Sequence, residues 1–259
     1  MSGCIKIKWY ATATVSIECG GDKLLFDPFL PLKGSETMLT PACFDGFSHV
    51  FITHGHFDHI EAVPGVIARN PMAMVYCTKT PYKTLRRKGV PKRNLRLTDP
   101  GEVIRVGSMK IRAYPGRHAI LPGVSVRRLR YVLQSPHKKN LAYIVRENLR
   151  CPEHDETLLY HVEVGGRTIS IMGSLNLRPE VEYPTRADVL LLPYNGWDDN
   201  DRPAVQVIRR LRPKRVLLDH FDDSFPPITM PINPAPLCRR FGGRVIVASE
   251  YGLATLNPR

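Results

Sequence analysis

The chain has 259 residues, 43% of them hydrophobic, and a formal net charge of +13. This length allows one large domain or two small ones with a well-buried core, and no apolar run approaches the roughly 18 residues of a membrane span. The six cysteines are scattered and include no C-x-x-C pair, which argues against a disulfide scaffold and is typical of a protein kept reduced.

The N-terminal part of the chain predicts a β-meander. Residues 5–9 and 11–18 alternate between apolar and polar side chains, as half-buried strands do, and Gly20-Gly21 marks a hairpin turn before a returning strand at 23–28. Asp27 lies at the end of that strand. Its carboxylate either supports a metal-binding loop from below or caps the turn at Pro28, and the sequence leaves these two roles open.

The most informative stretch ends the next predicted strand and reads Thr53-His54-Gly55-His56-Phe57-Asp58-His59. The two-residue period of an extended chain places His54 and His56 on the same side, where both imidazoles can reach one ion. Asp58 and His59 follow at the entrance to a helix expected from about Ile60, displaced from the first pair and free to face a second ion. A chance cluster of surface histidines is the alternative, but this spacing strongly favours a metal site.

Helices and strands then alternate along the chain. We expect a short helix at 60–69 broken by Pro64, a strand at 73–77, a helix at 81–88 and a hairpin at 103–114 that delivers His118 at a strand end. Later strands at 158–164 and 168–172 lead to Gly173-Ser174. A buried strand at 187–193, a helix at 203–211 and a strand from 214 then lead to His220.

Residues 121–156 are rich in charge, weakly periodic and longer than a hairpin connection requires. We interpret them as a basic insertion that lies over the site, a candidate lid within a single domain of residues 1–259. His137 and His154 within this insertion are expected to be surface residues rather than ligands. A second basic run, residues 79–96, contains no acid. Such segments either attract anions or are simply solvated.

The motif at 53–59 resembles the signature of the metallo-β-lactamase superfamily of metal-dependent hydrolases. Within it the chain is most similar to the branch that contains ascorbate-6-phosphate lactonase and the N-acyl phosphatidylethanolamine phospholipase D type enzymes. The resemblance covers Ile5 to about Leu256 apart from the insertion, and includes Trp9, Ala13-Thr14 and Asp27-Pro28. It implies an α/β chain of the α+β type, folded as a four-layer αββα sandwich of two mixed β-sheets.

The resemblance also implies a set of ligands. His118 would join His54 and His56 in a first metal site, and His220 would join Asp58 and His59 in a second. Relatives carry Gly-Asp where this chain has Gly173-Ser174, and the missing aspartate would bridge the two metals. A serine hydroxyl is uncharged at neutral pH and is a poor bridge, so Ser174 is a doubtful ligand. We therefore expect one firmly bound ion and a conditional second one, zinc before manganese or iron.

These expectations predict a metal-dependent hydrolase in which a metal-bound hydroxide attacks the substrate. Asp58 would be the catalytic carboxylate, orienting the nucleophile and carrying its proton. The basic segments and the resemblance favour an anionic, phosphorylated small molecule, a phosphodiester or a lactone. Two alternatives stay open. One is a nuclease acting on RNA or DNA, which the few aromatic residues of the basic runs disfavour, and the other is a non-catalytic mononuclear or metal-free binding protein.

The expected partner is therefore an anionic small-molecule substrate rather than a nucleic acid, and the sequence leaves homo-oligomerisation open. The N-terminus leads directly into a strand-like pattern, without the apolar region of a signal peptide. Together with the scattered cysteines, this predicts a cytoplasmic protein without a transmembrane segment.

Overall fold

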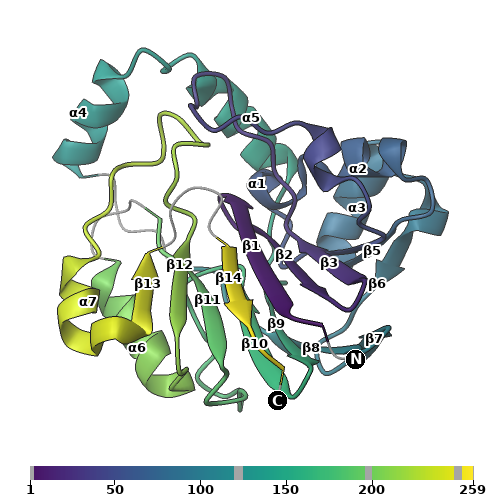
Figure 1. Ribbon diagram of the computed structural model, residues 1–259. Helices are drawn as coiled ribbons and strands as arrows, with labels where there is room; N and C mark the ends of the chain where they lie inside the picture. The colour runs from purple at the N-terminus through teal and green to yellow at the C-terminus, as the bar shows by residue number, and fades with distance from the viewer. Residues whose placement is uncertain (1–2, 120–124, 196–199, 248–252, 259) are drawn as a thin grey trace.

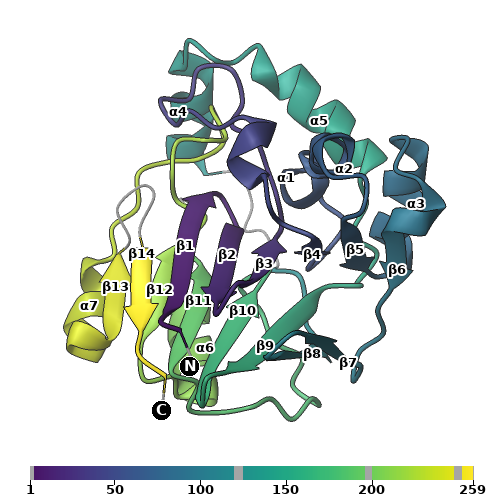
Figure 2. The ribbon, with the colours of Figure 1, turned by 45° about the vertical axis from the view of Figure 1, so that its right-hand side comes forward.

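The computed structural model describes residues 3–119, 125–195, 200–247 and 253–258, which form two seven-stranded β-sheets. The sheets lie face to face, and helices cover their outer faces (Figure 1, Figure 2). The predicted four-layer sandwich of two mixed sheets is confirmed. None of the described helices is long and apolar enough to span a membrane.

The first sheet has the strand order β14-β1-β2-β3-β4-β5-β6. It is antiparallel from β14 to β3 and parallel from β3 to β6, so it is mixed. Its strands are β1 (Ile5–Ala11), β2 (Thr14–Cys19), β3 (Asp22–Phe26), β4 (His49–Phe51), β5 (Met74–Cys77), β6 (Leu95–Leu97) and β14 (Leu253–Leu256).

The second sheet has the order β13-β12-β11-β10-β9-β8-β7. It is antiparallel from β7 to β10 and parallel from β10 to β13. Its strands are β7 (Val103–Val106), β8 (Met109–Pro115), β9 (Leu158–Val164), β10 (Arg167–Met172), β11 (Val189–Pro193), β12 (Val216–Asp219) and β13 (Val245–Val247).

Three apolar clusters hold the four layers together. The first lies between the sheets, where Tyr160 of β9 contacts the rings of Phe26 and Phe51 across the interface. The second packs the first sheet against α1 (Phe57–Ile60), α2 (Val63–Arg69), α3 (Lys79–Arg87) and α5 (Asn140–Arg150). The third packs the second sheet against α6 (Asp201–Leu211) and α7 (Ala235–Phe241).

The prediction of a helix at 60–69 is wrong about where the helix begins and where it is interrupted. The chain instead forms the single-turn α1 from Phe57, so Asp58 and His59 lie within its first turn, and Pro64 occupies the first turn of α2. Proline is tolerated there because the first amides of a helix have no intrahelical acceptor. The expected break is therefore a helix start.

The described part of the insertion is mostly helical rather than irregular. It forms α4 (Val126–Gln134) and α5, and residues 121–124 of the predicted insertion lie outside the described residues. The side chain of Ser125 caps α4 by accepting a hydrogen bond from the backbone amide of Arg128. Figure 1 shows α4 at one end of the molecule, set apart from both sheets, and α5 alongside α1.

The strand directions place several loops at one edge of the sandwich. Strands β3 and β4 are parallel, β8 and β10 are both antiparallel to β9, and β10 to β12 are parallel. The carboxyl ends of β8, β10 and β12 therefore share one edge of the second sheet. The segments that follow these ends carry most of the chemically interesting side chains.

Candidate metal centre

Asp27, directly after β3, fixes the loop that follows β4. Its carboxylate accepts hydrogen bonds from the backbone amide and the hydroxyl of Thr53, at 2.7 and 2.6 Å. Its Oδ2 also lies 2.9 Å from Nδ1 of His59. The backbone at Asp27 has a φ of 46°, a conformation that aspartate tolerates better than most residues. Of the two roles left open by the sequence, support of the loop and its histidine is the one these contacts show.

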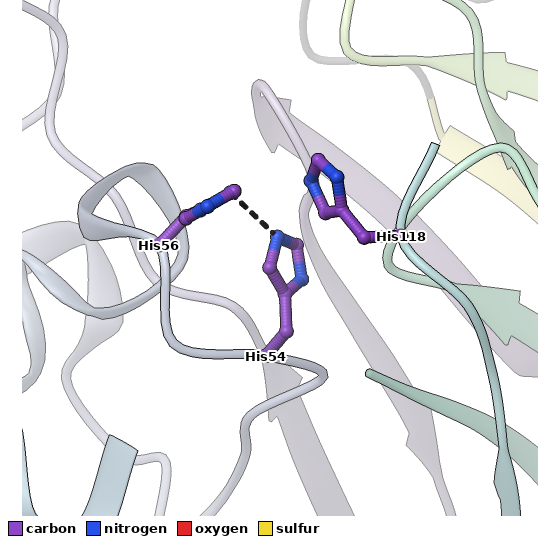
Figure 3. Close-up of side chains that lie close together, drawn as sticks. All are labelled: His54, His56 and His118. Atoms are coloured by element: carbon purple, nitrogen blue, oxygen red, sulfur yellow. Dashed lines mark hydrogen bonds between the residues drawn. The ribbon is translucent and has the colours of Figure 1, made fainter. Parts of the chain in front are cut away.

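A first group of imidazoles converges from two loops. His54 and His56 follow β4, and His118 follows β8, with ligand nitrogens of all three within 4.8 Å of one another (Figure 3). Nε2 of His54 lies 3.2 Å from Nδ1 of His56. Nδ1 of His118 donates to the carbonyl of Ala119 at 2.9 Å, which leaves its Nε2 free of a proton. We refer to these three residues as the first set.

A second group lies beside the first and comes from α1 and the end of β12. Asp58, His59 and His220 place one ligand atom each within 4.8 Å of the others. Oδ2 of Asp58 lies 3.2 Å from Nε2 of His220 and 3.7 Å from Nε2 of His59. The rings of His54 and His59 are 3.9 Å apart between centroids, so the two groups adjoin. We refer to Asp58, His59 and His220 as the second set.

Residues 22–221 match the family model described as the beta-lactamase superfamily domain. The chain belongs to the metallo-β-lactamase superfamily. A metal-dependent hydrolase of Pyrobaculum arsenaticum is 26% identical over 225 residues, which cover 86% of each chain.

Solved structures share the fold. A metallo hydrolase from the archaeon Ignicoccus hospitalis superposes with a TM-score of 0.66 at 19% identity, over 98% of this chain and 99% of that one. The diiron β-hydroxylase CmlA from Streptomyces venezuelae gives a TM-score of 0.61 at 15% identity, over 99% of this chain and 54% of that one. At these identities the likeness extends to the fold alone.

The electrostatics of the two sets differ. Burial lowers the pKa of His54 well below its usual value and that of His56 to about 4, and it also lowers the pKa of His118. These imidazoles are therefore neutral at pH 7 and present lone pairs. In the second set burial alone would lower the pKa of His220, but the hydrogen bond and charge of Asp58 outweigh it and raise that pKa to about 9.

This donor chemistry fits a divalent cation. The first set offers three neutral imidazoles, the ligand number of a catalytic zinc site with an open position. The second set offers the Asp58 carboxylate. Burial would raise the pKa of this carboxylate, but neighbouring His59 and His220 hold the pKa well below its usual value. A cation bound there would have to displace the proton that the raised pKa of His220 favours at neutral pH.

The hydroxyl of Ser174 contacts the loop that carries His118. Its hydroxyl oxygen accepts a hydrogen bond from the backbone amide of Ala119 at 2.9 Å, and the side-chain amide of Asn176 donates to the carbonyl of His118 at 3.3 Å. Both bonds tie the loop of His118 to the end of β10. The structure thus gives Ser174 a role in positioning that loop, which sequence reasoning had missed.

Two glycines are needed where loops meet around the site. A Cβ on Gly173 would lie 2.0 Å from the hydroxyl of Thr53, and one on Gly55 would lie 2.3 Å from the carbonyl oxygen of Pro152. Such distances are far below van der Waals contact, so any side chain at either glycine would displace the loop that carries His54 and His56. The motif therefore depends on close approach by β10 and by the end of the insertion.

Both sets line a cavity of about 770 Å³. Among the described residues that line it, Asp58 is the only acid, and the arginines are Arg117, Arg128 and Arg202. One wall is apolar and includes Ile144, Val145, Phe225 and Ile228. The sequence did not single out Arg117 or Arg202, because each is isolated from the basic runs.

The basic run at 79–96 contributes no residue to this lining. It forms α3 and the segment up to β6, on the outer face of the first sheet (Figure 2). Of the insertion, Arg128 and three residues of α5 reach the cavity, whereas His137 and His154 join neither metal set. The cationic character of the cavity therefore comes mostly from residues outside the two basic runs.

Proposed function

We propose that this protein is a metal-dependent hydrolase that acts on an anionic small molecule, with a phosphoryl or carboxylate group near the reacting bond. The observation that carries this proposal is that two adjoining His and Asp sets open into one cavity whose described lining holds three arginines and a single acid. Superfamily membership supports the same class of reaction.

His54, His56 and His118 would hold the firmly bound ion, and Asp58, His59 and His220 a conditional second one. Zinc suits the imidazole-rich first set best, with manganese and iron as alternatives. A divalent ion supplies Lewis acidity, because it lowers the pKa of bound water and polarises the bond under attack.

The chain's own residues would orient the reactants. The Asp58 carboxylate stays ionised at neutral pH and is buried beside His59 and His220, so it would orient the attacking water by accepting a hydrogen bond from it. The Asp27 carboxylate contacts Nδ1 of His59, and this contact would fix the orientation of the imidazole ring.

The arginines would select the charge of the substrate. Arg202 lies in the first turn of α6 and Arg117 directly before His118, and both are exposed at the cavity. The guanidinium of an arginine is planar and permanently charged, and it can donate two parallel hydrogen bonds to a phosphate or a carboxylate. Because the run at 79–96 lies outside the cavity, we do not propose a nuclease.

We further propose that residues 1–259 form a single domain and that residues 121–156 act as a lid over its cavity.

Replacing Arg202 tests the proposed substrate charge. We expect Arg202→Ala to lower kcat/KM for metal-dependent hydrolysis of the anion bis-p-nitrophenyl phosphate about tenfold. This factor corresponds to the free energy that one charge-assisted hydrogen bond contributes. Hydrolysis of the neutral p-nitrophenyl acetate should change less than about twofold, since no charge is recognised there.

Arg209→Ala is the matched control, because Arg209 is an exposed arginine of the same helix that does not line the cavity. This variant should hydrolyse both compounds at the rate of the unmodified protein. Equal losses on the two compounds in Arg202→Ala, or a selective loss in Arg209→Ala, would contradict recognition of the substrate's charge at the α6 end of the cavity.

A further inference from the structure

Helix α4 exposes an apolar stripe that nothing in the described chain covers. Val126, Leu129 and Leu133 are 67%, 49% and 60% exposed. They are three and four residues apart, so they lie on one side of the helix. None of the three belongs to any of the apolar clusters that hold the layers together. We call these three residues the α4 stripe.

The opposite side of α4 is attached to the molecule. Arg128 is 3% exposed, lines the cavity and donates to the carbonyl of Ile228 at 2.8 Å. Since Arg128 faces inward, the orientation of the helix is fixed and the stripe faces outward. Figure 1 shows α4 projecting at the periphery, clear of both sheets.

Within segment 125–150, which carries the stripe, the exposed charges have one sign. The exposed charged residues of this segment are all basic: Arg127, Arg130, Lys138, Lys139, Arg146 and Arg150. The single acid of this segment, Glu147, is buried, and it is shared by Lys88, Arg146 and Arg150. The described surface of the segment therefore combines apolar and cationic side chains and offers no exposed carboxylate.

We propose that α4 docks this protein on an anionic lipid surface, with the α4 stripe in the interface and the neighbouring cations over the headgroups. Amphipathic helices of this composition bind such surfaces by shallow insertion together with attraction to anionic lipids. The cavity would then open close to that surface, because Arg128 of α4 and Val145 of α5 line it.

Other occupants fit the stripe less well. A second copy of the chain would bring Arg127 and Arg130 toward their own equivalents across a two-fold axis. Three side chains are also far fewer than the roughly 20 residues on each side of a stable dimer interface. A nucleic acid would require stacking aromatic rings, and the stripe is aliphatic.

Vesicle co-sedimentation of the full chain tests the docking. With vesicles made of equal parts of phosphatidylglycerol and phosphatidylcholine, the protein should sediment, and added salt should weaken binding. Pure phosphatidylcholine vesicles should leave it in solution. Leu129→Ser combined with Leu133→Ser, and separately Arg130→Glu combined with Lys139→Glu, should each weaken binding about tenfold or more.

The control separates this surface from the general positive charge. Lys83→Glu combined with Lys92→Glu makes the same change of charge at exposed sites in and after α3, and should alter binding less than about threefold. Absence of sedimentation, sedimentation with pure phosphatidylcholine, or an equal effect of the control would overturn the proposal. So would a dimer in light scattering that the two leucine replacements dissociate. His54→Ala should sediment normally, so docking can hold or fail independently of the hydrolase.

Discussion

Replacement of His54 by alanine should remove the firmly bound ion and, with it, the hydrolytic activity. His54 is 1% exposed and belongs to the first set, and its ring lies next to those of His56 and His118 and next to that of His59 in the second set. Loss of a residue that hydrogen-bonds to a metal ligand lowers metal affinity about 10–100-fold. Loss of the ligand itself should therefore lower metal affinity at least about a hundredfold. Metal content by mass spectrometry and turnover of bis-p-nitrophenyl phosphate measure the two effects.

His154→Asn is a suitable control for His54→Ala. His154 is an exposed histidine of the insertion, belongs to neither metal set, and has a positive φ that asparagine tolerates. Metal content and turnover should match those of the unmodified protein. An active, metal-loaded His54→Ala protein would show that the first set is not the catalytic site.

Replacement of Asp27 by asparagine should affect both stability and metal binding. Asparagine keeps an oxygen for the Thr53 amide, but its NH₂ group would face the Thr53 hydroxyl and Nδ1–H of His59. A buried bond to a charged group contributes about 1.5–3 kcal/mol, so we expect a loss of about 3 kcal/mol in the free energy of unfolding. Metal affinity should fall about 10–100-fold, because His59 loses the acceptor that orients it.

Asp188→Asn distinguishes these two effects. Asp188 is also buried and accepts hydrogen bonds from the Thr168 amide, Arg167 and Lys214, at the opposite ends of β10 and β11 from the metal sets. Urea unfolding should show a comparable loss of stability, whereas metal titration should show unchanged affinity. If Asp27→Asn lowered stability without lowering metal affinity, Asp27 would only hold the loop and would not orient His59.

The short-range parts of the site were predictable from the sequence. His54, His56, Asp58 and His59 lie within six residues after an apolar strand, so local geometry alone brings them together. The positions of His118 and His220 at strand ends, read with the family resemblance, led to the same two groups that the structure brings together.

Contacts between distant segments were predictable only in part. The sequence offered support of the metal-binding loop as one of two roles for Asp27, and only the pairing of β3 with β4 decides between them. The bond from Ala119 to Ser174 depends on the path of a loop. The helices of the insertion were missed for another reason. In α4 the apolar residues face solvent and an arginine faces inward, which reverses the pattern that indicates a buried helix.

Anomalous scattering from crystals grown with zinc, manganese or iron tests the central claim most directly. We expect a strong peak about 2.0–2.2 Å from a nitrogen of each of His54, His56 and His118, in at least one of these metals. A weaker peak should lie among Asp58, His59 and His220. If loaded crystals gave no peak at the three histidines, or only peaks outside the cavity, the assignment of this site as a metal centre would be contradicted.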